Sequence, residues 1–189
     1  MVARAWHDGA VDDQRLVAAV LDGDRDAFRE LVERESVVIY RACLRILGRP
    51  HDAEDVAQES FVIAYRSLGS YRGDGPLGGW LLRIATRHAF RHAGRNAEST
   101  LDTLPERRDP SRRSDPLNAL LIGEEQAGIR RAVARLADPY REVVALRFFG
   151  ELSLAEIATV THRPLGTVKT HLRRGLERLR RDVEPQVQA

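Results

Sequence analysis

Hydrophobic residues recur at helical spacing along almost the whole chain. Between residues 13 and 68 they form successive stripes, within 16–21, 28–32 and 38–46. Stripes with this spacing are typical of helices that bury one face, whereas a half-buried strand alternates apolar and polar residues. No stretch of the sequence shows a convincing alternation of that kind. The pattern therefore predicts an all-α fold.

Two polar breaks interrupt the helical pattern. The glycine-rich loop 69–79 separates a helix that ends near Leu68 from one that begins near Trp80. The second break, 98–117, holds three prolines, charges of both signs and no aromatic residue, so it has little that it can bury. These breaks predict two small helical domains joined by a flexible linker: domain 10–97, linker 98–117 and domain 118–183.

The most specific local pattern lies between Leu152 and Arg180. Ser153 and Glu156 have the spacing of a capping box, and Pro164 suits the first position of a following helix. The pattern predicts a helix-turn-helix, two helices joined by a tight turn. Apolar side chains are expected on the inward side of the second helix: Leu165, Val168, Leu172, Leu176 and Leu179.

The second of these helices is strongly basic. Residues 163–181 contain seven Lys or Arg side chains and one acidic side chain, that of Glu177, which gives a net charge of +6. A helix of this charge attracts phosphates and releases counterions when it binds DNA. An ordinary solvated basic helix is the alternative interpretation. We predict that the outward side chains contact DNA: Thr167, Lys169, Thr170, His171, Arg173 and Arg174.

A second basic helix is expected to begin near Trp80. Its arginines fall four residues apart, and no acidic residue lies between Trp80 and Gly94. Unpaired like charges at this spacing mildly destabilise a helix, so their presence favours a phosphate partner over a merely solvated face. The arginine stripe predicted to contact a DNA backbone consists of Arg83, Arg87, Arg91 and Arg95.

The segment 51–65 carries the opposite charge. Ala57, Phe61, Ala64 and Tyr65 make a core stripe, which leaves the acidic side chains on the outer face. Acids in a first helical turn are expected from the helix dipole alone, but Glu59 lies beyond that turn. The pattern favours docking on a basic protein surface. This acidic cluster consists of Asp52, the expected N-cap, with Glu54, Asp55, Gln58 and Glu59.

The order of these segments resembles the extracytoplasmic-function group of the sigma-70 family of RNA polymerase sigma factors. The similar segments are 52–67, 75–95 and 136–180, and the resemblance covers nearly the whole chain. It implies sigma domains 2 and 4, and a role in directing RNA polymerase to promoters and melting the minus-ten element. His162 stands in the turn where relatives often carry glycine, and Thr170 and His171 stand where they often carry Ser-Arg.

The resemblance also implies partners and site residues. The acidic cluster would bind the clamp helices of the beta-prime subunit of bacterial core polymerase, and the beta flap is a further implied contact. The loop with Tyr71 and Arg72 would receive an unstacked base of the minus-ten element, next to Trp80 and the arginine stripe. Lys169 and its neighbours would face the minus-thirty-five element of promoter DNA. A separate anti-sigma factor is the last implied partner.

Composition bears on where the protein acts. The net charge is only +2, and no stretch approaches the roughly 18 apolar residues of a membrane helix or resembles a signal peptide. Cys43 is the only cysteine and lies in an apolar run, where a core thiol in a reducing cytosol is expected. We therefore expect a cytoplasmic protein without membrane insertion.

Two other classes of function fit the sequence less well. A self-sufficient helix-turn-helix regulator would need a dimer interface and usually a receiver domain, and residues 10–97 lack the alternating strands of a receiver. An enzyme interpretation can start from His51 and Asp52, or from His88 and His92. Neither pair is accompanied by the further residues that a metal or catalytic site would need. We predict no catalytic residue, no metal site and no cofactor.

Overall fold

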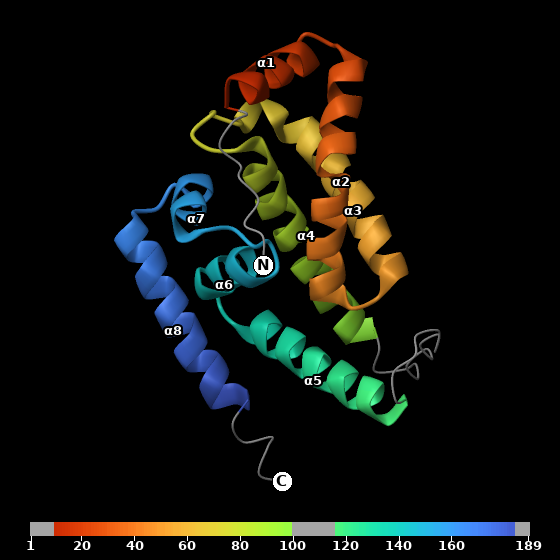
Figure 1. The fold of residues 1–189 in the computed structure, drawn as a ribbon, viewed down its shortest axis with the longest axis vertical. Helices are drawn as coiled ribbons and strands as arrows, with labels where there is room; N and C mark the ends of the chain where they lie inside the picture. The colour runs from red at the N-terminus through yellow and green to blue at the C-terminus, as the bar shows by residue number, and fades with distance from the viewer. Residues whose placement is uncertain (1–9, 100–115, 184–189) are drawn as a thin grey trace.

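The computed structural model describes residues 10–99 and 116–183, and all regular elements in these ranges are helices (Figure 1). The first part of the chain folds into α1 (Ala10–Leu21), α2 (Arg25–Leu47), α3 (Pro50–Ser67), the short 3-10 helix η1 (Leu68–Ser70) and α4 (Leu77–Ser99). The second part folds into α5 (Pro116–Arg135), α6 (Tyr140–Phe148), α7 (Leu154–Thr161) and α8 (Leu165–Val183). The predicted all-α fold is confirmed. Residues 100–115, most of the predicted linker, lie outside the described residues.

Short sequence signals set the helix ends. Asp24 caps α2, because its side chain accepts hydrogen bonds from two amides of the first turn. At α3, Arg49 is the N-cap and Pro50 opens the helix. Asp52 therefore lies within the first turn rather than at the N-cap predicted for it, where its charge still faces the positive end of the helix dipole.

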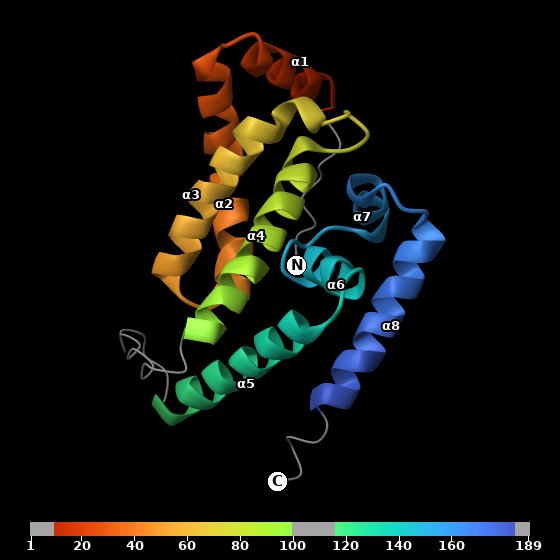
Figure 2. The same ribbon diagram turned by 180° about the vertical axis from the view of Figure 1, so that it is seen from behind.

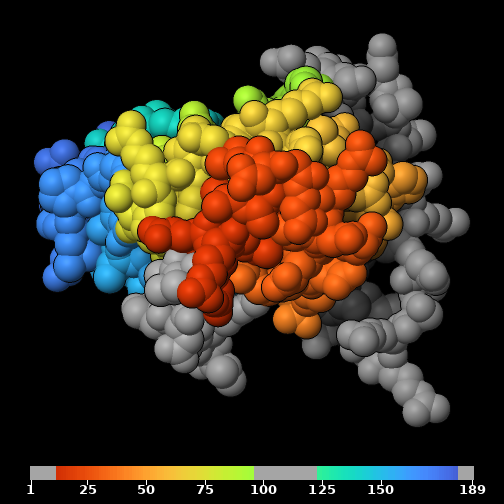
Figure 3. All heavy atoms as spheres, turned by 90° about the horizontal axis from the view of Figure 1, so that it is seen from above, coloured from red at the N-terminus to blue at the C-terminus, as the bar shows by residue number. Residues whose placement is uncertain are grey.

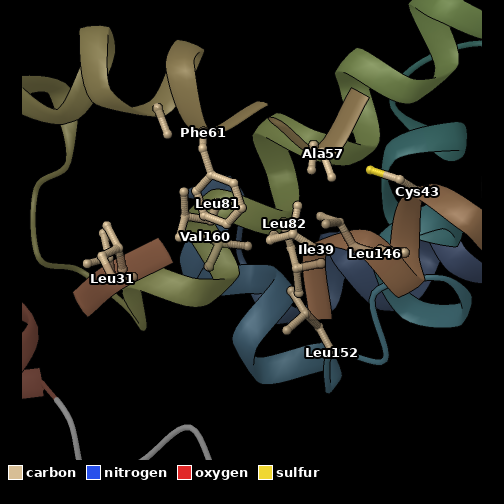
Figure 4. Packing of buried hydrophobic residues seen from close by; sticks show 14 of the residues in the cluster. Leu31, Ile39, Cys43, Ala57, Phe61, Leu81, Leu82, Leu146, Leu152 and Val160 are labelled. Atoms are coloured by element: carbon tan, nitrogen blue, oxygen red, sulfur yellow. The ribbon is translucent and has the colours of Figure 1, made fainter. Parts of the chain in front are cut away.

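Three long helices form the body of the first part. α2, α3 and α4 pack against one another along their length, and α1 lies across one end of them (Figures 1 and 2). Their shared interior includes the buried side chains of Leu31, Ile39, Phe61 and Leu82 (Figure 4). Cys43 lies in the same interior, as predicted, and burial raises the pKa of its thiol to about 12.

The second part packs onto α4. α6 and α7 lie against α4, α8 lies on α6 and α7, and α5 crosses the end of this group (Figures 1 and 2). Leu146, Leu152 and Val160 continue the interior that Leu81 and Leu82 form on α4 (Figure 4). A shared core therefore runs through both parts of the chain, with α4 between them.

Candidate protein-docking and nucleic-acid interfaces

The acidic cluster lies along the exposed side of α3. Asp55 Oδ2 lies 3.2 Å from Nδ1 of His51, and a backbone hydrogen bond together with the charge of Asp55 raises the pKa of His51. Glu59 Oε2 lies 2.7 Å from Nε2 of His88, a buried side chain of α4. The cluster thus forms one face of α3, and the contact between Glu59 and His88 joins that face to α4. It consists of half-buried Asp52 and the exposed residues Glu54, Asp55, Gln58 and Glu59.

An apolar groove between α2 and α3 adjoins the acidic cluster. Glu54 and Gln58 of the cluster line it, and its volume is about 470 Å³. The groove was not predicted from the sequence, although the run Val37–Tyr40 holds more apolar residues than one helix face can bury, and Val37 is 54% exposed. An apolar centre with a polar border is typical of protein interfaces. Its apolar lining comes from Val32, Val37, Tyr40, Ala57 and Phe61.

The loop before α4 is held in shape by its own aromatic residue. Tyr71 donates its hydroxyl hydrogen bond to the carbonyl of Gly75, and its ring meets Trp80 edge-on, with centroids 5.8 Å apart. Burial raises the pKa of Tyr71 to about 12, with a further contribution from the charge of Asp13. Arg72 is exposed. Tyr71 therefore braces the loop, while Arg72 is accessible to a partner.

The four arginines of the stripe on α4 fall into two environments. Arg83 donates from Nε to Glu142 Oε1 at 2.9 Å and from Nη1 to the carbonyl of Val160 at 3.0 Å. These contacts leave its side chain only 24% exposed. The second part of the chain thus engages the first arginine of the stripe. The remaining arginines are exposed: Arg87, Arg91 and Arg95.

Glu142 is the centre of this contact between the two parts. Its Oε2 lies 2.6 Å from Nη1 of Arg163, in the turn between α7 and α8, and its side chain is 7% exposed. Burial alone would raise the pKa of Glu142, but hydrogen bonds and charges from Arg83 and Arg163 hold it below its ordinary value. The carboxylate is therefore ionised at neutral pH and joins α4 to the helix-turn-helix.

Glycines in the loop before α4 and in its first turn let α7 approach very closely. A Cβ atom on Gly75 would lie 2.6 Å from Cγ2 of Thr159, and one on Gly79 would lie 2.8 Å from Cγ1 of Val160. Packed side chains do not tolerate such distances, so α7 can lie here only because these positions are glycine. In the sequence these glycines indicate only a loop, because their packing role depends on a neighbour distant in sequence.

The helix-turn-helix has the predicted caps. Glu156 accepts the amide hydrogen bond of Ser153 at 2.7 Å and donates its own amide to Ser153 Oγ at 3.2 Å. α7 ends at Thr161, and His162 follows with a left-handed φ of 53°. Glycine adopts this conformation freely, whereas a side chain makes it cost roughly 1 kcal/mol. His162 therefore holds the turn in a conformation that glycine would adopt at lower cost.

The basic face of α8 is largely open. Val168 is fully buried beneath it, but Leu165 and Leu176, both predicted to face inward, are 41% and 40% exposed. Most of the residues predicted to contact DNA lie on the accessible side of α8. Lys169, Arg173 and Arg174 are exposed, and Thr167 and Thr170 are partly exposed.

His171 lies apart from the other predicted DNA contacts of α8. Its ring packs edge-on against Tyr140 of α6, with centroids 5.6 Å apart. Partial burial and the nearby charges of Arg163 and Arg174 lower the pKa of His171. This side chain is half-buried and neutral above its lowered pKa, so it differs from the exposed cations beside it.

The described ranges hold neither a metal-binding cluster nor a membrane-spanning helix. Within residues 10–99 and 116–183, no three His, Cys, Asp or Glu side chains are placed to hold a metal ion. His88, one of the histidines considered as a metal ligand, is engaged with Glu59 instead. No helix in the same ranges has the length and apolar character needed to cross a membrane.

Two family models match the chain. Residues 31–98 match the model of sigma-70 region 2, and residues 126–179 match that of sigma-70, region 4. Together the two matches cover more than half of the chain. The first includes the acidic cluster and nearly all of α4, and the second includes α7 and most of α8.

Curated relatives are similar over nearly their full length. The chain is 34% identical over 179 residues to the ECF RNA polymerase sigma factor SigW of Bacillus subtilis, covering 90% of this chain and 96% of the relative. It is 34% identical over 182 residues to the RNA polymerase sigma-H factor of Pseudomonas aeruginosa, covering 92% and 94%. The similarity therefore spans both matched regions.

Solved structures share the fold. CnrH in complex with the cytosolic domain of CnrY matches with a TM-score of 0.58 at 24% identity, over 94% of this chain and 99% of that one. The sigma factor RpoE of Bartonella quintana, crystallised with the anti-sigma factor NepR, matches with a TM-score of 0.51 at 18% identity, over 83% and 96%. With both sigma regions present and full-length relatives at 34% identity, the chain belongs to the sigma-70 family, in the extracytoplasmic-function group of RNA polymerase sigma factors.

Proposed function

We propose that this chain is a non-enzymatic adaptor that brings bacterial RNA polymerase core to promoters and opens the minus-ten element. One observation carries the proposal: a chain that matches both sigma regions presents an acidic, apolar-centred docking face together with two basic helices. Opposite charges on separate faces suit a protein that binds both a basic protein surface and a polyanion. The protein acts in the cytoplasm, where the polymerase is found.

Core polymerase docks on the acidic cluster and the adjoining groove. The groove is lined by apolar side chains from α2 and α3, and Glu54 and Gln58 border it. An amphipathic helix with basic flanks fits such a surface, because apolar contact supplies affinity and charge sets orientation. The clamp helices of the beta-prime subunit are the partner proposed here, and the beta flap meets domain 118–183.

DNA binds the two basic helices, one in each proposed domain. In domain 10–97, the loop and α4 meet the minus-ten element, with Arg72 accessible and Tyr71 and Trp80 supporting the loop. In domain 118–183, the exposed side of α8 meets the minus-thirty-five element in the major groove. His171 contributes least there, because it packs on Tyr140. The linker 98–117 sets the spacing between the two domains.

An anti-sigma factor regulates the protein by covering one or both domains. Support comes from RpoE of Bartonella quintana, which shares the fold of this chain and was crystallised with the anti-sigma factor NepR. The docking groove and the basic face of α8 are the surfaces that such a partner would compete for. Purification from the native host that yielded polymerase alone, repeatedly, would count against this part of the proposal.

Run-off transcription with purified core polymerase tests the proposed function. We expect specific transcripts only when the chain and core are combined, and weak promoter binding by the chain alone. Transcripts that do not depend on the chain would overturn the proposal. Tight sequence-specific DNA binding without core would instead support the alternative of a self-sufficient helix-turn-helix regulator.

Reversing charge on the acidic cluster tests the docking surface. We expect Asp55→Lys combined with Glu59→Lys to lower the affinity for core by about tenfold or more, because like charges then face each other. Titration of labelled core measures this affinity. A control with the same charge change, Asp22→Lys combined with Glu30→Lys, alters exposed acids outside the cluster. Equal affinities for the two double variants would contradict the assigned surface.

A further inference from the structure

We propose that Asp13 of α1 is a positioning residue that fixes the start of α4 and the adjoining promoter loop 71–76 for base recognition. The inference rests on the proposed function, since it concerns how that loop meets the minus-ten element. Asp13 lies outside residues 31–98, the range that matches sigma-70 region 2. The support therefore comes from the contacts of this side chain and not from the family match.

Asp13 acts on the first residue of α4. Its side chain is buried, with only 4% of the residue exposed, and its Oδ2 accepts the amide hydrogen bond of Leu77 at 2.8 Å. The first amides of a helix have no partner within the helix, and a carboxylate there also faces the positive end of the helix dipole. α1 thus provides a cap for α4 from 64 positions away in the sequence.

A second contact fixes the orientation of this carboxylate. Asp13 Oδ1 accepts a hydrogen bond from Nη2 of Arg34 at 2.6 Å, and Nε of the same arginine donates to Glu35 at 3.0 Å. Both acids are almost fully buried, so Arg34 supplies the positive charge that makes their burial tolerable. Asp13 is therefore held between α2 and the start of α4 in one arrangement.

α1 also contacts the loop that precedes α4. Gly73 has a left-handed φ of 74°, and a Cβ atom there would lie 2.8 Å from Nε2 of Gln14, the neighbour of Asp13. Tyr71 closes the loop from within by its hydrogen bond to Gly75. Figure 3 shows the loop, in yellow, lying between α1, in red, and the blue helices of the second part. The loop is thus held from α1 and from within, and Arg72 stays exposed.

The position of these contacts predicts which part of promoter recognition depends on them. Docking on core uses α3 and the groove, and contact with a DNA backbone uses arginines further along α4. Loss of Asp13 should leave those surfaces intact and loosen only the first turn of α4 and the loop. Discrimination between bases in the minus-ten element should suffer most, because it depends on the shape of the loop.

The test compares Asp13→Ala, Asp13→Asn and the control Asp12→Ala, which alters the exposed neighbour on α1. Each variant is assembled with purified core. The probes are a single-stranded oligonucleotide with the minus-ten sequence that the wild-type holoenzyme selects from a randomised pool, and the same strand with one base changed. Fluorescence titration gives the affinity for both strands, and a separate titration gives the affinity for core.

We expect Asp13→Ala to weaken binding of the matched strand by about fivefold, because binding must then order a first turn of α4 that has lost its cap. The ratio of matched to mismatched affinity should move toward one. Asp13→Asn should have a smaller effect in the same direction, because an amide oxygen can still accept from Leu77. Affinity for core should change by less than about twofold, and Asp12→Ala should match the wild type.

The ratio of affinities separates positioning from stability. A variant that merely unfolds in part loses matched and mismatched binding equally, so an unchanged ratio would overturn the inference. If Asp13→Ala does not fold, Asp13→Asn decides by the same ratio. A wild-type holoenzyme that selects no sequence contradicts the proposed function itself. If the wild-type holoenzyme and the Asp13 variants all select the same sequence with the same ratio of affinities, the role of Asp13 is contradicted and the proposed function is not.

Discussion

The two basic helices of this chain, α4 and α8, differ in how freely they can meet DNA. On α4, Arg83 is bound by the carboxylate of Glu142 and the carbonyl of Val160. On α8, Lys169 and Arg174 are exposed. Both helices are basic, yet only on α4 does an acid from another helix bury a predicted DNA-contacting arginine. Glu177 pairs with Arg173 within α8 itself, and both of those side chains stay more than half exposed. Charge in the sequence therefore indicates an affinity for phosphate, and packing decides whether that affinity is available.

The contact at Glu142 couples the two helices. Glu142 lies on α6, Arg83 on α4, and Arg163 just before α8. A phosphate that reaches Arg83 must therefore displace the carboxylate of Glu142, which also binds Arg163 just before α8. In the packed arrangement, in which α6 and α7 lie against α4, we expect Arg83 to be kept from DNA while the cations of α8 stay accessible. The following predictions test this difference, starting with the largest expected effect.

Replacing Glu142 should abolish the difference in access to DNA between Arg83 of α4 and the cations of α8. Glu142→Ala leaves Arg83 and Arg163 facing each other without a counter-charge. Both arginines are about a quarter exposed, so the packed arrangement should lose about 1–3 kcal/mol, less than when a fully buried pair is broken. The two parts should separate, and the free chain should bind non-specific duplex DNA more tightly. Fluorescence transfer between dyes on α3 and α8 measures the separation, and titration at low salt measures the binding.

A matched control for that variant lies on α8. Glu177 pairs with Arg173 four residues earlier, but both side chains are more than half exposed, so Glu177→Ala should change the packing by less than about 0.5 kcal/mol. Both variants remove one acid and raise the net charge equally. Equal gains in DNA affinity would show that net charge, and not release of α4, explains the effect.

The approach of α7 to α4 offers a second way to separate them. Gly79→Ala places a methyl group 2.8 Å from Val160, which should weaken the packed arrangement by about 1–3 kcal/mol through overpacking. Gly94→Ala is the control, since the same helix has open space at that position and alanine should stabilise it slightly. The transfer signal should fall only for Gly79→Ala. A fall in both variants would contradict the assigned contact.

The contacts of Glu142 and Gly79 could not be predicted from the sequence, whereas several local features could. The capping box of Ser153 and Glu156 and the burial of Cys43 follow from local spacing and apolar pattern, and both were confirmed. The pairing of Glu142 with Arg83 spans 59 positions, and the arginine spacing defines a face of α4 without indicating what lies opposite it. For the same reason the sequence marked Gly79 as part of a loop and could not reveal its contact with α7.

Acid should weaken the packed arrangement through Glu142. Its pKa is lowered in the packed state and returns to the ordinary value, about 4.5, when Arg83 and Arg163 move away. The stabilisation is therefore complete above about pH 4.5 and is lost as the pH falls through the lowered pKa. The transfer signal should decline below that pH in the wild type. Glu142→Gln should lack this step, and an identical decline in that variant would assign it to other acids.

The smallest expected effect is a change in the salt dependence of DNA binding. It tests the comparison most sharply, because it shows in which arrangement each cation reaches a phosphate. Each phosphate contact adds about one to the slope of log affinity against log salt. Lys169→Ala should therefore lower the slope by about one in the wild type and also in a Glu142→Ala background, since Lys169 is exposed in the packed arrangement. Arg83→Ala should lower it only in the Glu142→Ala background, where the carboxylate no longer competes with DNA. Titration of the four resulting variants with one duplex provides the comparison. If Arg83→Ala alone lowers the slope as much as Lys169→Ala does, α4 is already free to bind, and the contact at Glu142 does not control it.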